Sequence, residues 1–189
     1  MPALPGGDSG QQGASTVADP LAEQALAYLR SHNTTTIATV GPDGPWAAAV
    51  FYASVGFELY YLSAPDSRHS VNIQADPRVA VTINEDYRDW RQIKGIQMEG
   101  EVHLLGDEAE LARATAVYVE KYPFTARYLK LLLSPFASVV KYLDKVLERL
   151  PFAPEINASP AKFYKITPHQ LFFIDNEHGL GKRREIPLG

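Results

Sequence analysis

The spacing of apolar residues changes near residue 33 from a helical period to the shorter runs that are typical of β-strands. Asp19-Pro20 provides an N-cap and a proline at the first helical position, which predicts a helix that begins there. The residues on its apolar face are Leu21, Ala25, Tyr28 and Leu29. Asn33 is the predicted stop.

Short β-branched and aromatic runs separated by turn residues follow, and they predict five strands. The strands are expected at residues 34–40, 46–54, 58–63, 78–84 and 93–105. A short helix from Ser67 to Ala75 lies between the third and fourth strands, because Asp76-Pro77 cannot continue it. Gly95 and Gly100 are predicted to be bulges or points of close approach inside the fifth strand.

The last third of the chain combines helix and strand. A helix is predicted at 107–121 and strands at 161–166 and 171–174. Residues 122–158 interrupt the pattern with an amphipathic helix at 135–150, which we expect to pack on the barrel or across a dimer contact. A lid and a membrane-surface helix are the alternatives. Short connections predict antiparallel strands in a small barrel.

Composition narrows the possible classes of protein. At 189 residues we expect one domain, residues 18–189, after a disordered tail at residues 1–17 that is rich in Gly, Ser, Gln and Ala. A net charge of −4 argues against nucleic-acid binding, and no apolar run reaches the roughly 20 residues that a bilayer needs. The chain has no cysteine and no histidine pair at metal-ligand spacing, so no metal site is expected. A cytoplasmic protein is the expectation.

The segment from Tyr60 to Asn72 carries the candidate chemistry. A strand ends, turns and enters a helix that begins Ser67-Arg68-His69. Free amides of a first helical turn, a hydroxyl, a guanidinium and an imidazole together favour phosphate. The alternative is an ordinary surface helix start at which Arg68 and His69 face water.

Five segments in order and spacing resemble the FMN-binding split barrels of the pyridoxamine 5′-phosphate oxidase-like family. They are residues 46–52, 59–63, 67–69, 76–81 and 93–102. The segments 163–166, 173–176 and 179–182 are similar to an uncharacterised bacterial branch of that superfamily. The resemblance covers about residues 20–122 and 160–185.

The resemblance implies a mainly β, α+β fold: a six-stranded antiparallel split β-barrel with flanking helices. It also implies a homodimer with FMN in the cleft between subunits. The FMN phosphate would contact Ser63, Ser67, Arg68 and His69. The ribityl chain and ring edge would follow Ala48, Val50, Phe51 and Tyr52. Lys94, Gly95 and Gln97 would meet the pyrimidine end of the flavin, and Lys182 would approach from the partner subunit.

Two departures from the family pattern matter. Many members have Lys at the position of His69, and a histidine titrates near neutrality. We expect bound phosphate to raise the His69 pKa, and FMN binding to weaken as pH rises through it. The chain ends Lys182-Arg183-Arg184 instead of the Arg-Leu-His-type segment that grips pyridoxamine phosphate. Oxidation of pyridoxamine phosphate is therefore not expected, and Arg183 and Arg184 are predicted to be solvated.

These expectations favour a flavin-dependent oxidoreductase that acts on a small molecule. The cofactor carries the hydride chemistry, so the sequence singles out no catalytic residue. The alternatives are a non-catalytic FMN-binding protein, a deazaflavin-using reductase, and a haem-binding or haem-degrading split barrel in which His178 would be the axial ligand.

Overall fold

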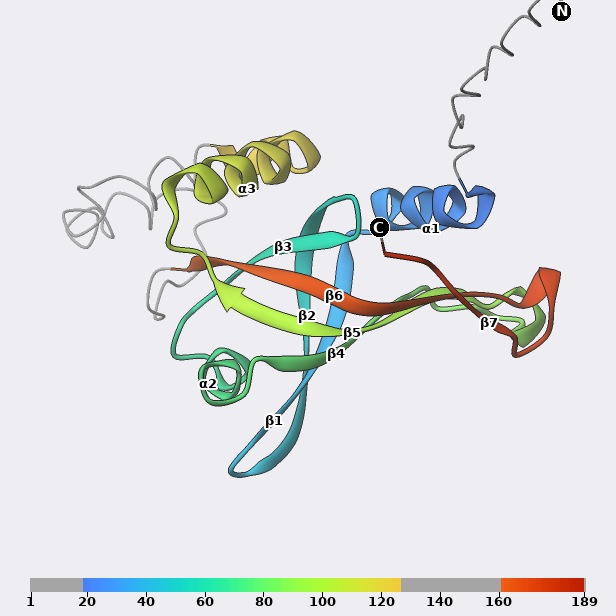
Figure 1. The fold of residues 1–189 in the computed structure, drawn as a ribbon, viewed down its shortest axis with the longest axis horizontal. Coiled ribbons are helices and arrows are strands. Elements are labelled where there is room, and N and C mark those ends of the chain that lie inside the picture. Colours follow the sequence, from blue (N-terminus) through green and yellow to red (C-terminus); the bar gives the residue numbers. More distant parts are fainter. Residues whose placement is uncertain (1–18, 127–160, 189) are drawn as a thin grey trace, which may run out of the picture.

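The computed structural model describes residues 19–126 and 161–188, which form a β-barrel with helices around it (Figure 1). The strands are β1 Thr34–Gly41, β2 Gly44–Val55, β3 Glu58–Ser63, β4 Arg78–Asn84, β5 Lys94–Leu104, β6 Lys162–Asp175 and β7 Arg183–Glu185. The α-helices are α1 Pro20–Ser31, α2 Arg68–Ala75 and α3 Glu108–Lys121, and short 3-10 turns are η1 Trp90–Gln92, η2 Pro123–Thr125 and η3 Asn176–His178.

The strands run in the order β3-β2-β1-β4-β5-β6, and β3 also pairs with β6. That last pairing closes a six-stranded antiparallel barrel, so the predicted fold class is confirmed. β3 and β4 have the bounds expected from the sequence. β7 was not predicted, and it pairs with the C-terminal half of β6 through part of the basic run.

β6 is one continuous strand where the sequence predicted two. Pro168 lacks an N–H and breaks the local pattern, but the strand passes it with a β-bulge. Glu99 of β5 faces Gln170, whereas Gly100 faces Pro168, so His169 is the extra residue. A Cβ on Gly100 would lie 2.3 Å from the Thr167 carbonyl oxygen. The close approach predicted at Gly100 is therefore present.

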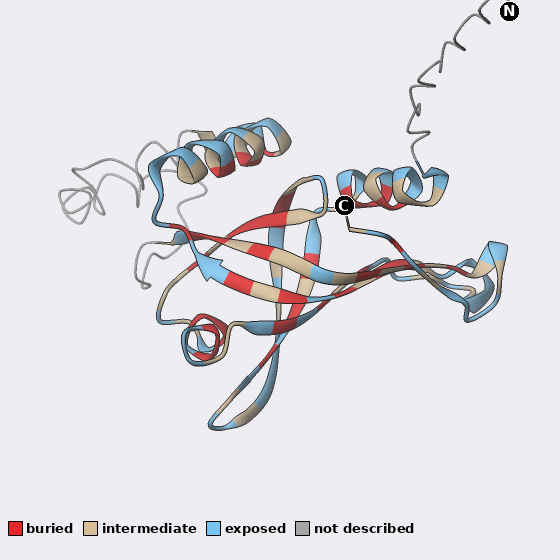
Figure 2. Ribbon diagram, viewed as in Figure 1, coloured by how far each residue is buried: buried red, intermediate tan, exposed pale blue. Residues whose placement is uncertain are grey.

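Two apolar clusters hold the helices to the barrel (Figure 2). The larger cluster fills the barrel and includes Ala25, Tyr28 and Leu29 of α1. The smaller cluster joins Ala114 and Tyr118 of α3 to residues of β2, β3 and β6. The apolar face expected for α1 is thus turned toward the sheet, and the apolar residues of α3 are turned toward it as well.

Lys121 ties the end of α3 to the end of α1. Its Nζ donates to the His32 carbonyl oxygen and lies 4.2 Å from the centre of the Tyr52 ring. Both contacts favour the ammonium form. Burial acts in the opposite direction and lowers the pKa of Lys121 to about 8.

α2 is locked against the hairpin of β1 and β2. Asn72 donates from Nδ2 to Thr39 Oγ1 at 3.0 Å. A Cβ on Gly41 would lie 2.0 Å from Asn72 Oδ1, so only glycine lets the helix approach this closely. The hydrogen bond from Asn72 and the close approach at Gly41 fix α2 relative to the hairpin.

The expected tail at residues 1–17 lies outside the described residues, as does nearly all of the expected insertion at 122–158, including its helix at 135–150. In the described ranges, no helix is long and apolar enough to cross a membrane.

Gly100→Ala should lower the free energy of unfolding by about 1–3 kcal/mol, because the added methyl group meets backbone that cannot move aside. Gly106→Ala is the matched control, since nothing lies within 4 Å of its Cβ position. We expect the control to stay within about 0.5 kcal/mol of the parent. Urea denaturation measures both, and equal midpoints for the two variants would contradict the close-approach assignment.

Candidate functional site

Four polar side chains meet where β3 ends and α2 begins. Ser63 is the last residue of β3, and its Oγ lies 2.7 Å from His69 Nε2 and 3.1 Å from Ser67 Oγ. Ser67 donates from Oγ to Ser70 Oγ at 2.9 Å. We call Ser63, Ser67, His69 and Ser70 the hydroxyl cluster. Ser70 was not predicted as a site residue, although its position three residues after Ser67 places it one helical turn away.

The hydroxyl of Ser67 is used within this cluster instead of capping the helix. Ser67 is the N-cap residue of α2, yet its side chain accepts no hydrogen bond from the first turn. N-cap serines usually satisfy one of those amides. The first backbone amides of α2 therefore have no side-chain acceptor at the N-cap, and the partial positive charge of the helix start can attract an anion.

His69 is buried and points inward, so the alternative in which it faces water is wrong. Burial lowers its pKa below the usual 6.5, because the charged imidazolium loses solvation. In the free protein the shift is thus opposite to the one expected with bound phosphate. At neutral pH the cluster is uncharged.

Arg68 is exposed and lies on the hairpin of β1 and β2. Its guanidinium carbon is 4.5 Å from the centre of the Trp46 ring, and Nη2 donates to the Asp43 carbonyl oxygen at 3.1 Å. Arg68 is thus a cation that directly precedes His69 in α2, with its guanidinium held on the hairpin.

The four residues expected from β2 differ in accessibility. Ala48 and Val50 are half-buried, and Phe51 is 52 % exposed. Tyr52 is fully buried; its hydroxyl donates to the Leu29 carbonyl oxygen, and its own carbonyl accepts from Tyr122. The Tyr52 side chain therefore faces the core, and a role of this residue at a ligand stays a prediction that its side chain does not support.

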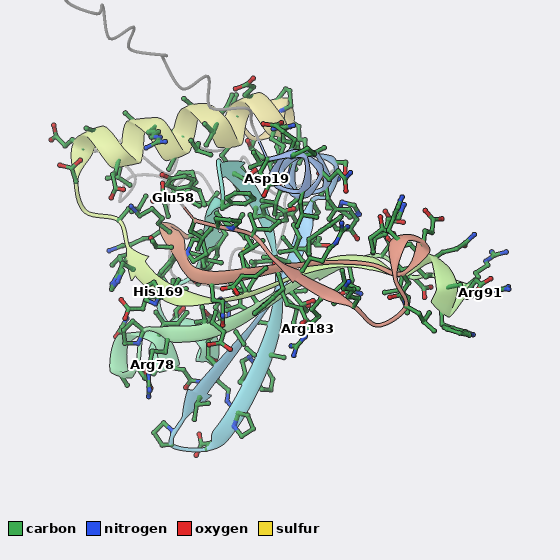
Figure 3. All side chains as sticks on the ribbon, turned by 45° about the vertical axis from the view of Figure 1, so that its right-hand side comes forward. Asp19, Glu58, Arg78, Arg91, His169 and Arg183 are labelled. Atoms are coloured by element: carbon green, nitrogen blue, oxygen red, sulfur yellow. The ribbon has the colours of Figure 1, made fainter. Side chains whose placement is uncertain are left out.

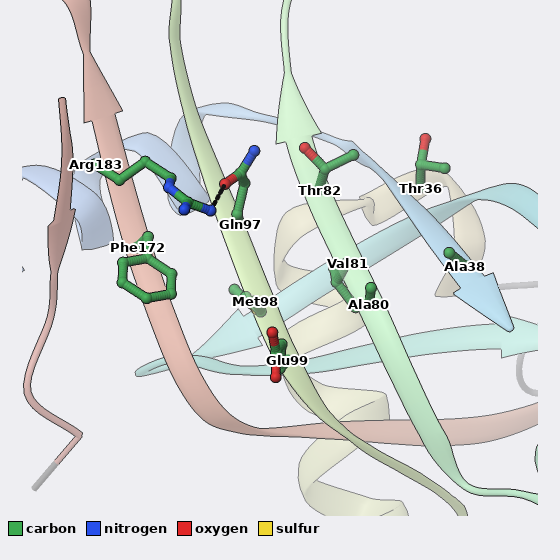
Figure 4. A pocket seen from close by; sticks show the side chains of 10 residues that line it. All are labelled: Thr36, Ala38, Ala80, Val81, Thr82, Gln97, Met98, Glu99, Phe172 and Arg183. Carbon is green, nitrogen blue, oxygen red and sulfur yellow. Dashed lines mark hydrogen bonds between the residues drawn. The ribbon is translucent and has the colours of Figure 1, made fainter. Parts of the chain in front are cut away.

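Lys94, Gly95 and Gln97 lie at two hollows on the outer surface of the barrel. One hollow of about 360 Å³ is lined by all three. A second of about 270 Å³ shares Gln97 and Thr82 with the first (Figure 4). Across its opening, Arg183 donates to Gln97 Oε1 at 3.5 Å and lies over the Phe172 ring. Arg183 is exposed, as predicted, whereas Arg184 is half-buried.

An ion-pair network stands beside these hollows. Lys94 Nζ is 2.7 Å from Glu177 Oε2 and 3.8 Å from Asp175 Oδ2, and the bond to Glu177 raises the Lys94 pKa. His178 donates from Nδ1 to the buried Asp175 carboxylate at 2.9 Å, and its side chain is 66 % exposed. Within the described parts of the chain, no three His, Asp or Glu side chains group to hold a metal ion.

The expected site residues thus lie in two groups, one at the start of α2 and one in the first half of β5. α2 leads into β4 at Arg78, while Gly95 pairs with Asn84 at the other end of β4. Those seven residues span about 20 Å. Arg78 and Arg91, which flank the two groups, lie far apart in Figure 3. Lys182 is exposed and directly precedes β7, which lies at the end of the molecule away from α2 (Figure 1).

Comparison with known proteins assigns this arrangement to a family. The family model for pyridoxamine 5′-phosphate oxidase matches residues 21–149. The chain belongs to the pyridoxamine 5′-phosphate oxidase family. A UPF0306 protein of Photorhabdus laumondii is 35 % identical over 99 residues, which cover 51 % of this chain and 68 % of that protein.

Solved structures with the same fold include two proteins that are named for haem. A heme binding protein from Mycobacterium smegmatis has a TM-score of 0.61 at 20 % identity, covering 90 % of this chain and 59 % of that one. The heme storage protein HutZ of Vibrio cholerae has a TM-score of 0.54 at 16 % identity, covering 79 % and 92 %. At these identities the likeness shows the fold alone.

For this pyridoxamine 5′-phosphate oxidase family member, burial of His69 predicts a pH-dependent stability. Above pH 6.5 the imidazole is uncharged in both states. As pH falls below 6.5, the unfolded state binds the proton first, so stability falls until the lowered pKa is reached. Denaturation series across this window should show unfolding free energy rising with pH.

His69→Gln should flatten that slope, whereas His169→Gln, which removes an exposed histidine, should keep it. A slope that is unchanged in His69→Gln would contradict a buried, neutral His69.

Proposed function

We propose that this protein binds FMN at the interface of a homodimer and works as a flavin-dependent oxidoreductase on a small molecule. The observation that carries the proposal is the hydroxyl cluster with Arg68 beside it at the start of α2. A phosphate is the anion that uses each of these groups.

The side chains fit a phosphate group in chemistry and in number. The serine hydroxyls can turn to donate to phosphate oxygens, and the Arg68 guanidinium is a planar fork that matches two of them. His69 Nε2 lies within hydrogen-bond distance of Ser63 and can join as a donor when protonated. Because the cluster holds no carboxylate, nothing in it opposes an anion.

The remaining expected contacts would serve the flavin ring. Gln97 lies between the two hollows, and Lys94 supplies a cation beside them. Amide and ammonium donors suit the pyrimidine end of a flavin, where negative charge gathers on reduction. FMN, when bound, would supply the hydride chemistry, while the protein binds, orients and shields the ring.

The outer faces of β1 and β2 support a dimer. Residues that point outward there are small, apolar or hydroxyl-bearing, and none carries a charge; they are Thr34, Thr36, Ala38, Val40, Ala47, Ala49 and Phe51. Val40 is 63 % exposed. An uncharged surface of small and apolar side chains favours association with a second copy. In such a dimer, the family resemblance implies that Lys182 approaches the site of the other subunit.

Haem is the second candidate ligand, and His178 is the observation that favours it. Its Nδ1 is held by the buried Asp175 carboxylate, which leaves Nε2 for another partner. Histidines that bind a metal commonly donate their other N–H to a carboxylate in this way. The fold is shared with a heme binding protein, which adds weight to this candidate.

Arg68→Ala should weaken FMN binding by about 10- to 100-fold, as expected for loss of a charge-assisted contact to phosphate. Riboflavin, which lacks the phosphate, should bind the variant within about twofold of the parent, because that contact is absent in both. Fluorescence titration of both flavins measures the difference. Arg78→Ala, which removes another exposed arginine close to α2, is the control. Equal FMN affinity in parent and Arg68→Ala would exclude the phosphate assignment.

The colour of the purified protein separates the two cofactors. Bound flavin should absorb at about 450 nm, whereas haem gives a Soret band at about 400 nm. If haem is the ligand, His178→Ala should abolish the axial-ligand spectrum, and Asp175→Asn should weaken haem binding by about 10-fold or more. His103→Ala removes an exposed histidine of β5 as a control. A flavin spectrum that survives His178→Ala would dismiss the haem candidate.

A further inference from the structure

Trp46 is an exposed aromatic side chain that contacts Arg68 of α2. It lies in β2 and is 41 % exposed, although an indole is normally buried when nothing binds it. The Arg68 guanidinium lies over its ring at 4.5 Å. Trp46 has no role in the ligand contacts expected from the sequence.

We propose that Trp46 is a positioning residue that holds the Arg68 guanidinium ready for a phosphate, and so gives the site its preference for a phosphorylated ligand. This inference rests on the proposed function, because the phosphate in question is that of FMN. It adds a residue outside the phosphate contacts, acting through Arg68.

The contacts of Arg68 leave it able to bind while holding it still. The indole covers one face of the guanidinium, and the Asp43 carbonyl oxygen accepts from Nη2. An arginine has five N–H donors, so most remain for an anion. A long exposed side chain otherwise loses rotamer freedom when it closes on a ligand. Holding it in place beforehand reduces that loss and tightens binding.

The backbone of Trp46 is fixed to the same helix that carries Arg68. Asn72, one turn after Arg68 in α2, donates to Thr39 Oγ1 at 3.0 Å. Thr39 pairs with Trp46 in the sheet and donates from Oγ1 to the Trp46 carbonyl oxygen at 3.4 Å. The close approach of Gly41 to Asn72 completes this frame. Because α2 is attached to the hairpin by these contacts, the backbones that carry the Trp46 ring and the Arg68 guanidinium are fixed relative to each other.

An opposite role is physically conceivable: the indole could hold Arg68 away from the ligand. The two roles predict opposite signs. If Trp46 positions Arg68 for phosphate, removing the indole weakens FMN binding; if it restrains Arg68 elsewhere, removal tightens it. The positioning role is favoured because Arg68 directly precedes His69 at the start of α2, and its contacts with Trp46 and Asp43 leave most of its N–H donors unused.

The test compares the affinities of FMN and riboflavin, whose ratio reports the phosphate contact alone. Trp46→Ala should lower this ratio by about three- to tenfold, the effect of losing a cation–π contact and the order that it imposes. Trp46→Phe keeps a ring and should restore part of the ratio. Leu104→Ala, an exposed apolar change at the end of β5, should leave the ratio unchanged. Thermal melting of each variant verifies the fold.

Arg68→Ala provides the background that separates positioning from a general structural effect. In that background Trp46→Ala should change the ratio no further. Trp46 emission, isolated in a Trp90→Phe protein, should also change on addition of inorganic phosphate, and should not change with Arg68→Ala.

Each other outcome overturns a specific claim. A ratio that is unchanged or raised in Trp46→Ala overturns the positioning role, and so does an equal loss in the Arg68→Ala background. A parent protein with no preference for FMN over riboflavin overturns the proposed function and the positioning role with it.

Discussion

The pairing of β3 with β6 is the contact on which the rest of the structure depends. It closes the barrel, and its last rung joins Ser63 to Lys162. Closure fixes where β3 ends, and the chain then turns at once into α2. Because α2 is also locked to the hairpin by Asn72, the Ser63 hydroxyl and the His69 imidazole have little freedom to separate. The candidate site is therefore a consequence of barrel closure.

This frame produces a site that is polar, largely neutral and ready for an anion. The Ser63 and Ser67 hydroxyls contact an imidazole whose pKa is lowered by burial, Ser70 is hydrogen-bonded to those two serines, and the exposed Arg68 supplies the charge. A permanent second cation would bind phosphate more strongly but would be repelled by Arg68 in the free protein. A neutral histidine avoids that repulsion, and a bound dianion can then draw a proton onto it. A histidine at position 69 is therefore neutral in the free protein and becomes charged only when phosphate binds.

Much of the fold was predictable because its signals are local. β-branched runs between Gly, Pro and Asp turns placed five strands, and the Asp19-Pro20 pair placed α1. The direction of Tyr52 was not predictable, since β2 is apolar on both faces and its alternation does not identify the inner one. β6 was divided at Pro168 because the bulge that carries the strand past it depends on Gly100, far away in sequence.

In the candidate site too, local features were predictable and long-range contacts were not. The helix start at Ser67-Arg68-His69 is a local pattern, whereas the inward turn of His69 and the placement of Arg68 on Trp46 depend on strands that the pattern does not contain.

The most direct test of the central claim is an NMR titration of the His69 ring, free and with FMN or riboflavin. The account predicts a pKa below 6.5 in the free protein, a rise above 6.5 with FMN, and no comparable rise with riboflavin. A His69 pKa that FMN leaves unchanged, or that both flavins shift alike, would contradict a phosphate site at the start of α2.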